Sequence, residues 1–171
     1  MQFRVPEILE TDRLVLRRFN ESDLEDIHRY FSDTVATQFT VRKSYSRLET
    51  WKALCVMIAH WQIKNYGPYA MVEKASKKVI GISGYWFPYD WPEAEIKWAL
   101  VRNHWGKGYA TEATKLVQYV ALEYMPEMKL ISFIHPKNEA SIKLAMRLGC
   151  VLERKLPFRD DVWHVYKHPS Q

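Results

Sequence analysis

Apolar side chains recur with the 3.6-residue period of a helix in four stretches of the chain. One helix is predicted after Ser22, which forms a capping-box pattern with Glu25, and another after Ser46, which has the same spacing to Glu49. A third helix follows residue 111, and a fourth follows Asn138, a typical N-cap residue. The stripes are Leu24, Ile27, Tyr30 and Phe31; Leu48, Trp51, Leu54, Cys55, Ile58 and Trp61; Ala113, Leu116, Val117, Val120, Ala121 and Tyr124; and Ile142, Ala145 and Leu148.

Between these helices the apolar positions alternate with a period of two. The alternation predicts strands over 13–19, 69–73, 79–87 and 93–101, and shorter ones over 130–134, 151–154 and 162–166. In the stretch 93–101, Ile96, Trp98 and Leu100 share one face, and Glu95, Lys97 and Ala99 share the other. Too few strand–helix–strand units are present for a doubly wound sheet. We therefore predict a mixed α/β (α+β) fold in one domain over residues 1–171.

Composition and charge narrow the class of protein. A chain of 171 residues with 47% hydrophobic and 26% charged side chains suits one soluble globular domain. No apolar run approaches the roughly 20 residues that cross a bilayer, and the N-terminus lacks the apolar core of a signal peptide, so we expect a cytoplasmic protein without membrane contact. The net charge of +5 favours anionic partners. No dense Lys/Arg run indicates direct nucleic-acid binding, and a phosphorylated small molecule fits this charge equally well.

The sequence predicts neither a metal site nor a nucleophile triad. Cys55 and Cys150 lie in apolar surroundings and are expected to be small core residues. His164 and His168 are four residues apart on a predicted strand and tail, where that spacing does not bring them together as it does on a helix. Residues 81–84, Gly-Ile-Ser-Gly, lack the Gly-x-Ser-x-Gly spacing of a hydrolase elbow.

The stretch WGKGYATEA, residues 105–113, carries the most specific signal. Gly106 and Gly108 flank Lys107 directly before a predicted helix. The unpaired N–H groups and the dipole of a helix N-terminus suit a phosphate or diphosphate, and glycines let the backbone come close. A Walker loop is absent, and a dinucleotide fingerprint needs a third glycine where Thr111 stands. Two interpretations of this turn remain: a tight turn that binds no ligand, and a phosphate-binding turn of a family other than these two.

Three stretches in a fixed order resemble the GNAT acetyltransferases, in particular their ribosomal-protein N-terminal acetyltransferase (RimJ/RimL-like) branch. They are ETDRLVLRRFNESDLEDI at 10–27, WALVRNHWGKGYATEA at 98–113 and NEASIKLAMRLGCV at 138–151. The resemblance covers about residues 8–167. It implies a mostly antiparallel sheet, splayed between the strands at 93–101 and 130–134 and flanked by about four helices. It also implies acetyl-CoA as cosubstrate and no metal.

The resemblance also implies roles for individual residues. A backbone amide within the strand end faces the acetyl oxygen, the main chain of the glycine turn binds the diphosphate, and Asn138 contacts the pantetheine arm unless it serves as the N-cap alone. The strand-end residues are Ala99, Leu100 and Val101, and the turn residues are Trp105, Gly106, Lys107, Gly108, Tyr109, Ala110 and Thr111.

Two positions depart from the family pattern. Asn103 stands where many members have Arg or Gln, and Ala145 stands where many have a tyrosine that protonates the departing thiolate. Ser141, in the first turn of the same helix, is the hydroxyl we predict to take over, against a serine bonded only to local backbone. Glu95 is our first choice of base for the amine. Its strand neighbour Glu93 and the turn residues Asp160 and Asp161 are weaker candidates.

The predicted function is acetyl transfer from acetyl-CoA to a primary amine, by direct attack with both substrates bound. The amine belongs to a protein N-terminus or to a small molecule, and the aromatic stretch 85–91 is the candidate wall of its cleft. A net positive enzyme suits polycationic aminoglycosides poorly. A non-catalytic acyl-CoA-binding module of the same fold and a nucleotide-binding protein of another fold are the alternatives. We expect a monomer or a homodimer.

Overall fold

The computed structural model describes residues 3–158 and 160–170 and forms one mixed α/β domain. Its helices are α1 (Leu24–Phe31), α2 (Thr34–Thr37), α3 (Arg47–Lys64), α4 (Tyr109–Tyr124) and α5 (Glu139–Arg147), with 3-10 turns η1 (Glu21–Asp23) and η2 (Arg102–His104). Its strands are β1 (Ile8–Glu10), β2 (Leu14–Arg17), β3 (Pro68–Glu73), β4 (Val79–Trp86), β5 (Glu95–Leu100), β6 (Ile131–Ile134), β7 (Val151–Phe158) and β8 (Asp161–Lys167).

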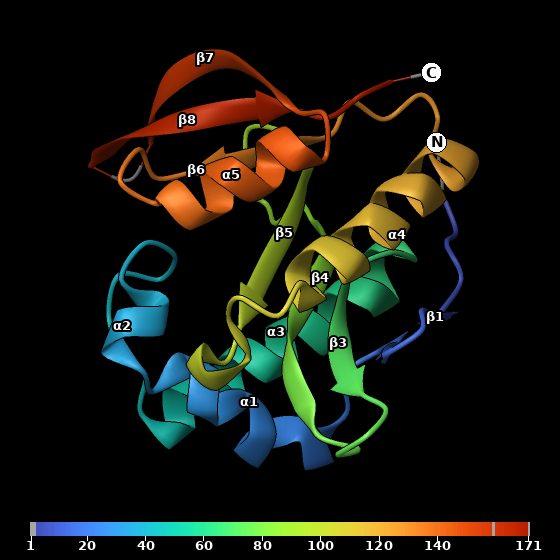
Figure 1. The fold of residues 1–171 in the computed structure, drawn as a ribbon, viewed down its shortest axis with the longest axis vertical. Coiled ribbons are helices and arrows are strands. Elements are labelled where there is room, and N and C mark those ends of the chain that lie inside the picture. The colour runs from blue at the N-terminus through green and yellow to red at the C-terminus, as the bar shows by residue number, and fades with distance from the viewer. Residues whose placement is uncertain (1–2, 159, 171) are drawn as a thin grey trace.

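The strands form one splayed sheet, seen in Figure 1 with α4 and α5 in front of it. The strand order is β1-β2-β3-β4-β5-β6-β8-β7. Neighbours are antiparallel except β5 and β6, which run parallel and pair at one position, Glu95 with Ile131. From that point the two strands diverge, so the predicted splay is confirmed. The three-residue strand β1 was not predicted from the sequence.

The two predicted capping boxes have different outcomes. Ser46 caps α3: its Oγ accepts from the Glu49 N–H, and the Glu49 carboxylate accepts from the Ser46 N–H at 2.8 Å. The box predicted for Ser22 and Glu25 is wrong. Instead the chain turns at Asn20, whose side chain accepts from the Ser22 N–H and whose own N–H donates to Asp23.

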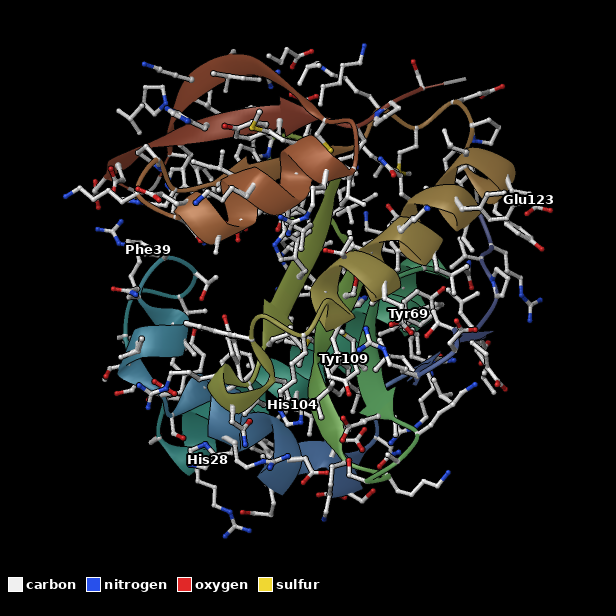
Figure 2. All side chains as sticks on the ribbon, in the orientation of Figure 1. His28, Phe39, Tyr69, His104, Tyr109 and Glu123 are labelled. Atoms are coloured by element: carbon white, nitrogen blue, oxygen red, sulfur yellow. The ribbon has the colours of Figure 1, made fainter. Side chains whose placement is uncertain are left out.

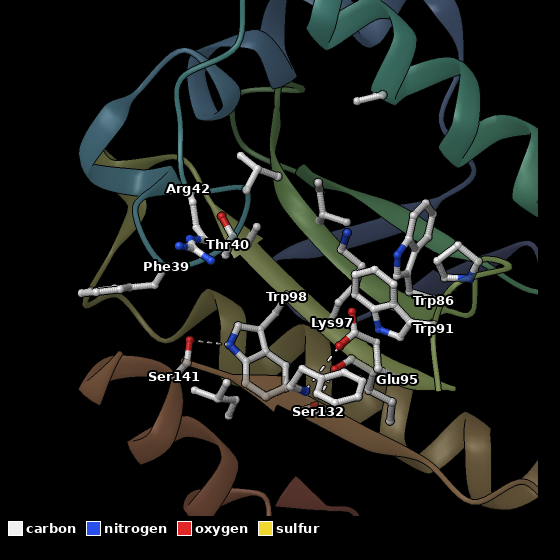
Figure 3. Close-up of a pocket in the computed structure, with 18 of the residues that line it drawn as sticks. Phe39, Thr40, Arg42, Trp86, Trp91, Glu95, Lys97, Trp98, Ser132 and Ser141 are labelled. Atoms are coloured by element: carbon white, nitrogen blue, oxygen red, sulfur yellow. Dashed lines mark hydrogen bonds between the residues drawn. The ribbon is translucent and has the colours of Figure 1, made fainter. Parts of the chain in front are cut away.

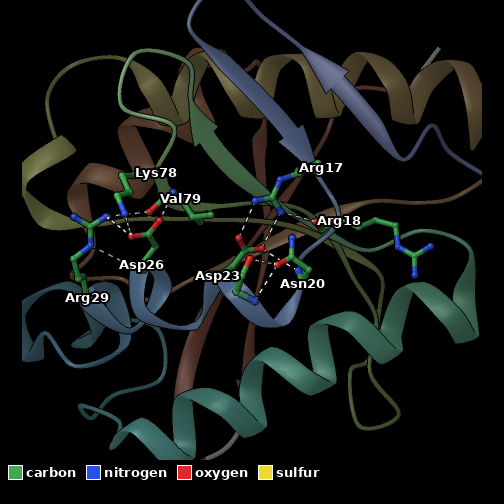
Figure 4. A network of polar contacts seen from close by, with 9 residues as sticks. Arg17, Arg18, Asn20, Asp23, Asp26, Arg29, Lys78 and Val79 are labelled. Atoms are coloured by element: carbon green, nitrogen blue, oxygen red, sulfur yellow. Dashed lines mark hydrogen bonds and ion pairs between the residues drawn. The ribbon is translucent and has the colours of Figure 1, made fainter.

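Arg17 on β2 explains this earlier start. Its guanidinium makes two hydrogen bonds of 2.8 Å to the buried Asp23 carboxylate, as Figure 4 shows. These bonds raise the pKa of Arg17 above its usual value, against the opposing effect of burial. A charge pair across 6 residues thus overrides the local Ser–Glu pattern.

Two segments have no periodic signal strong enough to predict. Helix α2 spans four residues and is held by Asp33, whose side chain accepts from the Val35 and Ala36 N–H groups. Strand β7 continues beyond the predicted end to Phe158 and contains Pro157. It is an edge strand, where a residue without an N–H is tolerated.

Two apolar clusters, one on each face of the sheet, hold the helices in place. Val117 and Ala121 of α4 pack with Ile96 on one face, and Ile27 of α1 and Leu54 of α3 pack on the other. The predicted stripes are partly wrong at their ends: Leu48, Trp51 and Tyr124 are exposed. Cys150 is buried as predicted, whereas Cys55 is half-buried.

Candidate active site

The glycine turn lies between η2 and α4, beside the end of β5. Gly106 has φ +73° and Gly108 has φ +82°, backbone conformations that residues with a side chain rarely adopt. A Cβ added at Gly106 would meet no atom within 4 Å, and at Gly108 it would meet Arg13 Nη2 at 3.4 Å. The left-handed backbone, rather than crowding within the protein, therefore explains why these positions are glycines.

This turn presents a row of free main-chain donors. The first amide of α4 with an acceptor is that of Glu112, which donates to Gly108 O at 3.0 Å. Trp105 N–H is also used, by Arg102 O at 3.1 Å. Within residues 3–158 and 160–170, no acceptor pairs with the six N–H groups of residues 106–111. The turn therefore has the donors that a diphosphate needs, at the positive end of a helix of 16 residues.

The N-terminal stretch fixes this turn from outside. Arg13 donates from Nη1 to Lys107 O at 2.9 Å and from Nε to Glu112 Oε2 at 2.7 Å. Thr11 Oγ1 donates to the other oxygen of Glu112. Burial raises the pKa of Glu112, but the hydrogen bonds from Thr11 and Arg13 outweigh it, and the pKa lies below its usual value. We call Thr11, Arg13 and Glu112 the loop clamp.

The Tyr109 side chain belongs to the same support. The Arg13 guanidinium lies 4.2 Å from the centre of its ring, and its hydroxyl donates to Glu73 at the end of β3. Figure 2 shows Tyr109 close to His104 below the start of α4, and their ring centroids are 6.0 Å apart. Since the Tyr109 side chain is engaged in this support, its main-chain N–H is the group it offers to a ligand.

At the end of β5, where one backbone amide was predicted to face the gap, the three residues differ in the direction of their N–H groups. Val101 N–H donates to Ile80 O on β4 at 2.9 Å. Main-chain groups alternate in direction along an antiparallel pair, so the Ala99 amide also points to β4. Among the three predicted residues, Leu100 is the one whose N–H faces the gap toward β6. By the same alternation the Trp98 N–H also faces the gap, although Trp98 was not among the three predicted residues.

Asn138 is the N-cap of α5. Its Oδ1 accepts from the Ser141 N–H at 3.2 Å, and the residue also lines the cavity described below. The N-cap role is therefore the one observed. Its side-chain NH₂ group has no recorded acceptor among the described residues, so a contact to pantetheine through that group remains a prediction.

Ser141 is held by an indole that reaches across the gap. Trp98 Nε1–H donates to Ser141 Oγ at 3.1 Å, drawn as a dashed line in Figure 3. The Ser141 hydroxyl thus keeps its own proton for another acceptor. Ala145, at the position of the family tyrosine, is fully buried, and Trp98 packs against the same apolar cluster.

A cavity of about 510 Å³ lies beside the gap, bordered by α1, by the segment that follows α2 and by α3. Glu95 and Lys97 line it from β5, and Ser141 and Asn138 line it from α5. Glu95 is 7% exposed, and its Oε2 accepts from the Phe133 N–H at 3.3 Å. Burial lowers the pKa of Lys97, and the Glu95 charge opposes this shift. The predicted base and hydroxyl thus border one cavity.

The weaker base candidates have other environments. Glu93 pairs with Lys129 at 3.0 Å and with Arg154, and it does not line the cavity. Asp160 is an exposed turn residue. Asp161 contacts His135 at 3.3 Å and Arg42 at 3.7 Å. Of the predicted base candidates, Glu95 is the one that lines the cavity, together with Asp90, which was not predicted.

The aromatic stretch 85–91 divides into three environments. Tyr85 is a core residue whose hydroxyl donates to Val117 O. Trp86 and Trp91 line the cavity. Tyr89 is fully exposed. The predicted acceptor wall therefore consists of the two tryptophans, joined by aromatic rings from other strands.

Among the described residues, no group of three or more His, Cys, Asp or Glu side chains is arranged to hold a metal ion. No helix in the described ranges is long and apolar enough to cross a membrane.

Three contributors were not identified from the sequence as functional: the loop clamp, Trp98 and Lys97. Thr11 and Arg13 stand in the first family-like stretch and Glu112 in the second. Their presence in those stretches was a signal, but nothing in the sequence shows that the residues meet. Trp98 and Lys97 lie on the predicted strand faces, where spacing gives the face and not the partner.

Comparisons with known proteins agree with this geometry. Residues 13–151 match the family model for the acetyltransferase (GNAT) domain. The chain is 30% identical over 146 residues to an uncharacterized N-acetyltransferase, p20, of Bacillus licheniformis, which covers 84% of this chain and 82% of that protein.

Solved structures share the fold over nearly the whole chain. An acetyltransferase from Agrobacterium tumefaciens superposes with a TM-score of 0.85 at 27% identity, covering 99% of this chain and 98% of that one. RimL, a ribosomal alpha-N-protein acetyltransferase in complex with coenzyme A, superposes with a TM-score of 0.76 at 20% identity, covering 96% and 98%. The chain therefore belongs to the GNAT acetyltransferase family, and it is an N-acetyltransferase.

Proposed function

We propose that this enzyme transfers the acetyl group of acetyl-CoA to a primary amine, with both substrates bound side by side in the splayed sheet. The observation that carries the proposal is the row of unpaired amides at residues 106–111, directly before α4. These amides bind the diphosphate of coenzyme A, and the pantetheine arm runs from there into the gap between β5 and β6. The coenzyme A bound to RimL, a protein of the same fold, supports this assignment.

The chain supplies positioning and proton transfer. The amide of Leu100, with that of Trp98, donates to the acetyl oxygen and stabilises the negative charge that develops there. Glu95 takes a proton from the attacking amine, directly or through a water. The amine nitrogen then bonds to the carbonyl carbon while the carbon–sulfur bond breaks.

The departing sulfur needs a proton donor because Ala145 offers none. Ser141 fills this role: its Oγ accepts from Trp98 Nε1, so its own proton is free to move to the thiolate. A serine hydroxyl is a weak acid, but the N-terminus of α5 stabilises the negative charge as it forms.

The acceptor is a protein N-terminus or a small-molecule amine. The three family-like stretches favour a position in the RimJ/RimL-like branch, whereas the likeness to RimL, at 20% identity, does not identify the acceptor. The aromatic cavity of about 510 Å³ favours a small acceptor, or the first residue of a peptide, over a bulky one.

Thiol release from acetyl-CoA in the presence of peptides, amino acids, polyamines and antibiotics tests the proposal. Glu95→Gln should lower kcat about 100-fold, in the range expected for loss of a general base. Glu93→Gln is the matched control, because Glu93 precedes the same strand outside the cavity, and it should retain wild-type turnover. Acetyl-CoA binding without thiol release for any amine would overturn the proposal in favour of a binding module.

A further inference from the structure

The cavity that borders Ser141 has many aromatic side chains in its lining. Six of them, which we call the aromatic wall, come from six different segments: Phe39, Trp86, Trp91, Phe133, Phe158 and Trp163. Trp91 and Phe158 meet edge to face at 5.1 Å between centroids, and Phe133 stacks on Phe158 at 5.8 Å. Such a wall favours an acceptor with a flat or bulky apolar body.

Two cationic side chains line the cavity, Arg42, which is paired with Asp161 at 3.7 Å, and Lys97, which lies on this wall. Lys97 Nζ lies 4.6 Å from the centre of the Trp86 ring, and Figure 3 shows both side chains at the cavity. Trp86 is itself stacked on His60 at 5.0 Å. His60 is held at both nitrogens, by the Phe87 N–H at 3.0 Å and by Tyr66 O at 2.9 Å. The support beneath the Lys97 ammonium is therefore rigid.

This ammonium lacks a directly bonded anion. In the part of the chain that the structure describes, no carboxylate lies within 4.0 Å of Lys97 Nζ, which instead lies over the Trp86 ring. Glu95 is its nearest acidic neighbour along the strand, two residues away, and acts on it through space. A half-buried charge without a partner is costly, so a ligand that brings an anion is stabilised there.

Glu95 and Lys97 lie on the same face of β5. They are two residues apart, which is about 6.6 Å along the strand. A molecule with an amine and a carboxylate separated by one or two carbons fits between two such side chains.

We infer that the acceptor is an amino acid with a large apolar side chain: Lys97 binds its carboxylate, its amine faces Glu95, and its side chain packs on the aromatic wall. This inference rests on the proposed acetyl transfer and names its substrate class. A polyamine, in contrast, brings a second positive charge toward Lys97 and is disfavoured.

The test compares two probes, one with and one without a carboxylate, on two proteins, one with and one without the Lys97 ammonium. Binding of L-phenylalanine and of 2-phenylethylamine to the coenzyme A-loaded protein is measured by calorimetry, for the wild type and for Lys97→Met. The wild type should bind phenylalanine about 10- to 100-fold more tightly than phenylethylamine, the range for a hydrogen bond between charged groups. Lys97→Met should abolish this difference, and Lys97→Arg should restore most of it.

Lys64→Met is the matched control, because Lys64 Nζ also lies over an aromatic ring, at 5.1 Å from Phe87, but does not line the cavity. It should keep the preference for phenylalanine. Equal affinity of the wild type for both probes, or an equal loss of both in Lys97→Met, overturns the inference even when thiol release is observed. A charge preference that is intact without any thiol release instead counts against the proposed transfer.

Discussion

The glycine turn at residues 106–111 and the cavity beside α1 and α3 differ in the groups that they offer to a ligand. The turn offers main-chain N–H groups from one continuous stretch. The cavity offers side chains from β4, β5, β6, β7, β8 and the helical layer. A main-chain site suits a group that never changes, such as a diphosphate, whereas a side-chain site is altered by single substitutions. We therefore propose that the turn, the first half of the site, binds the cosubstrate and that the cavity, the second half, sets the acceptor.

The largest effect should come from the glycines. Alanine at a left-handed position costs about 1–2 kcal/mol, so Gly106→Ala with Gly108→Ala removes about 2–4 kcal/mol from the productive loop. We expect the KM for acetyl-CoA to rise at least 30-fold, with a smaller change in the KM for the amine. Steady-state kinetics measure both values. Gly149→Ala, at φ +76° after α5, is the control for strain elsewhere.

An equal rise of both KM values would show that the two halves are not separate sites.

The loop clamp should have the next largest effect. Arg13→Gln removes the bonds to Lys107 O and Glu112 while leaving every turn amide in place. Because Arg13 is largely exposed, we expect about a tenfold rise in the KM for acetyl-CoA rather than the full value of a charged hydrogen bond.

Arg18→Gln is the control for the clamp, since Arg18 pairs with Glu7 at 3.4 Å, away from the turn. An unchanged KM in Arg13→Gln would show that the turn keeps its shape without the clamp.

The two halves meet where β5 and β6 separate, and His168 supports that point. Ser132 Oγ donates to Ile96 O and contacts His168 Nε2 at 2.9 Å. Burial lowers the pKa of His168 from 6.5 to about 4. The unfolded chain therefore binds a proton that the folded chain refuses between these values, and stability falls as the pH falls through this window.

Between pH 6.5 and 5.5 the expected loss from His168 is about 1.4 kcal/mol or less. Urea unfolding at the two pH values measures it. His168→Gln should reduce this pH dependence, and the remainder belongs to His60 and His104, whose pKa values are also lowered by burial. A variant with the same pH dependence as the wild type would exclude His168 as its source.

The smallest effect should come from Ser141. Ser141→Ala removes the proposed proton donor to sulfur but none of the turn amides, so kcat should fall about fivefold with little change in acetyl-CoA affinity. Trp98→Phe removes the N–H donor to Ser141 and keeps an aromatic ring, so kcat should fall less in this variant than in Ser141→Ala. Unchanged turnover in Ser141→Ala would remove the residue from the mechanism.

The same contrast explains what the sequence revealed. The strand at 93–101 and the helix after the glycines were predicted because periodicity and the glycine motif are local signals, whereas the splay was predicted from the family resemblance. The Ser22 capping box failed because Arg17 and Asp23, brought together by the fold, compete with it. The loop clamp joins residues 99 positions apart, and the aromatic wall joins six segments. No spacing rule connects such positions, so these parts of the site emerge only from the folded chain.

A crystal structure with bound acetyl-CoA tests the central claim most directly. The account predicts diphosphate oxygens within about 2.7–3.2 Å of at least two N–H groups of residues 106–111, with Arg13 still bonded to Lys107 O. A diphosphate bound elsewhere, with these amides facing solvent, would contradict it.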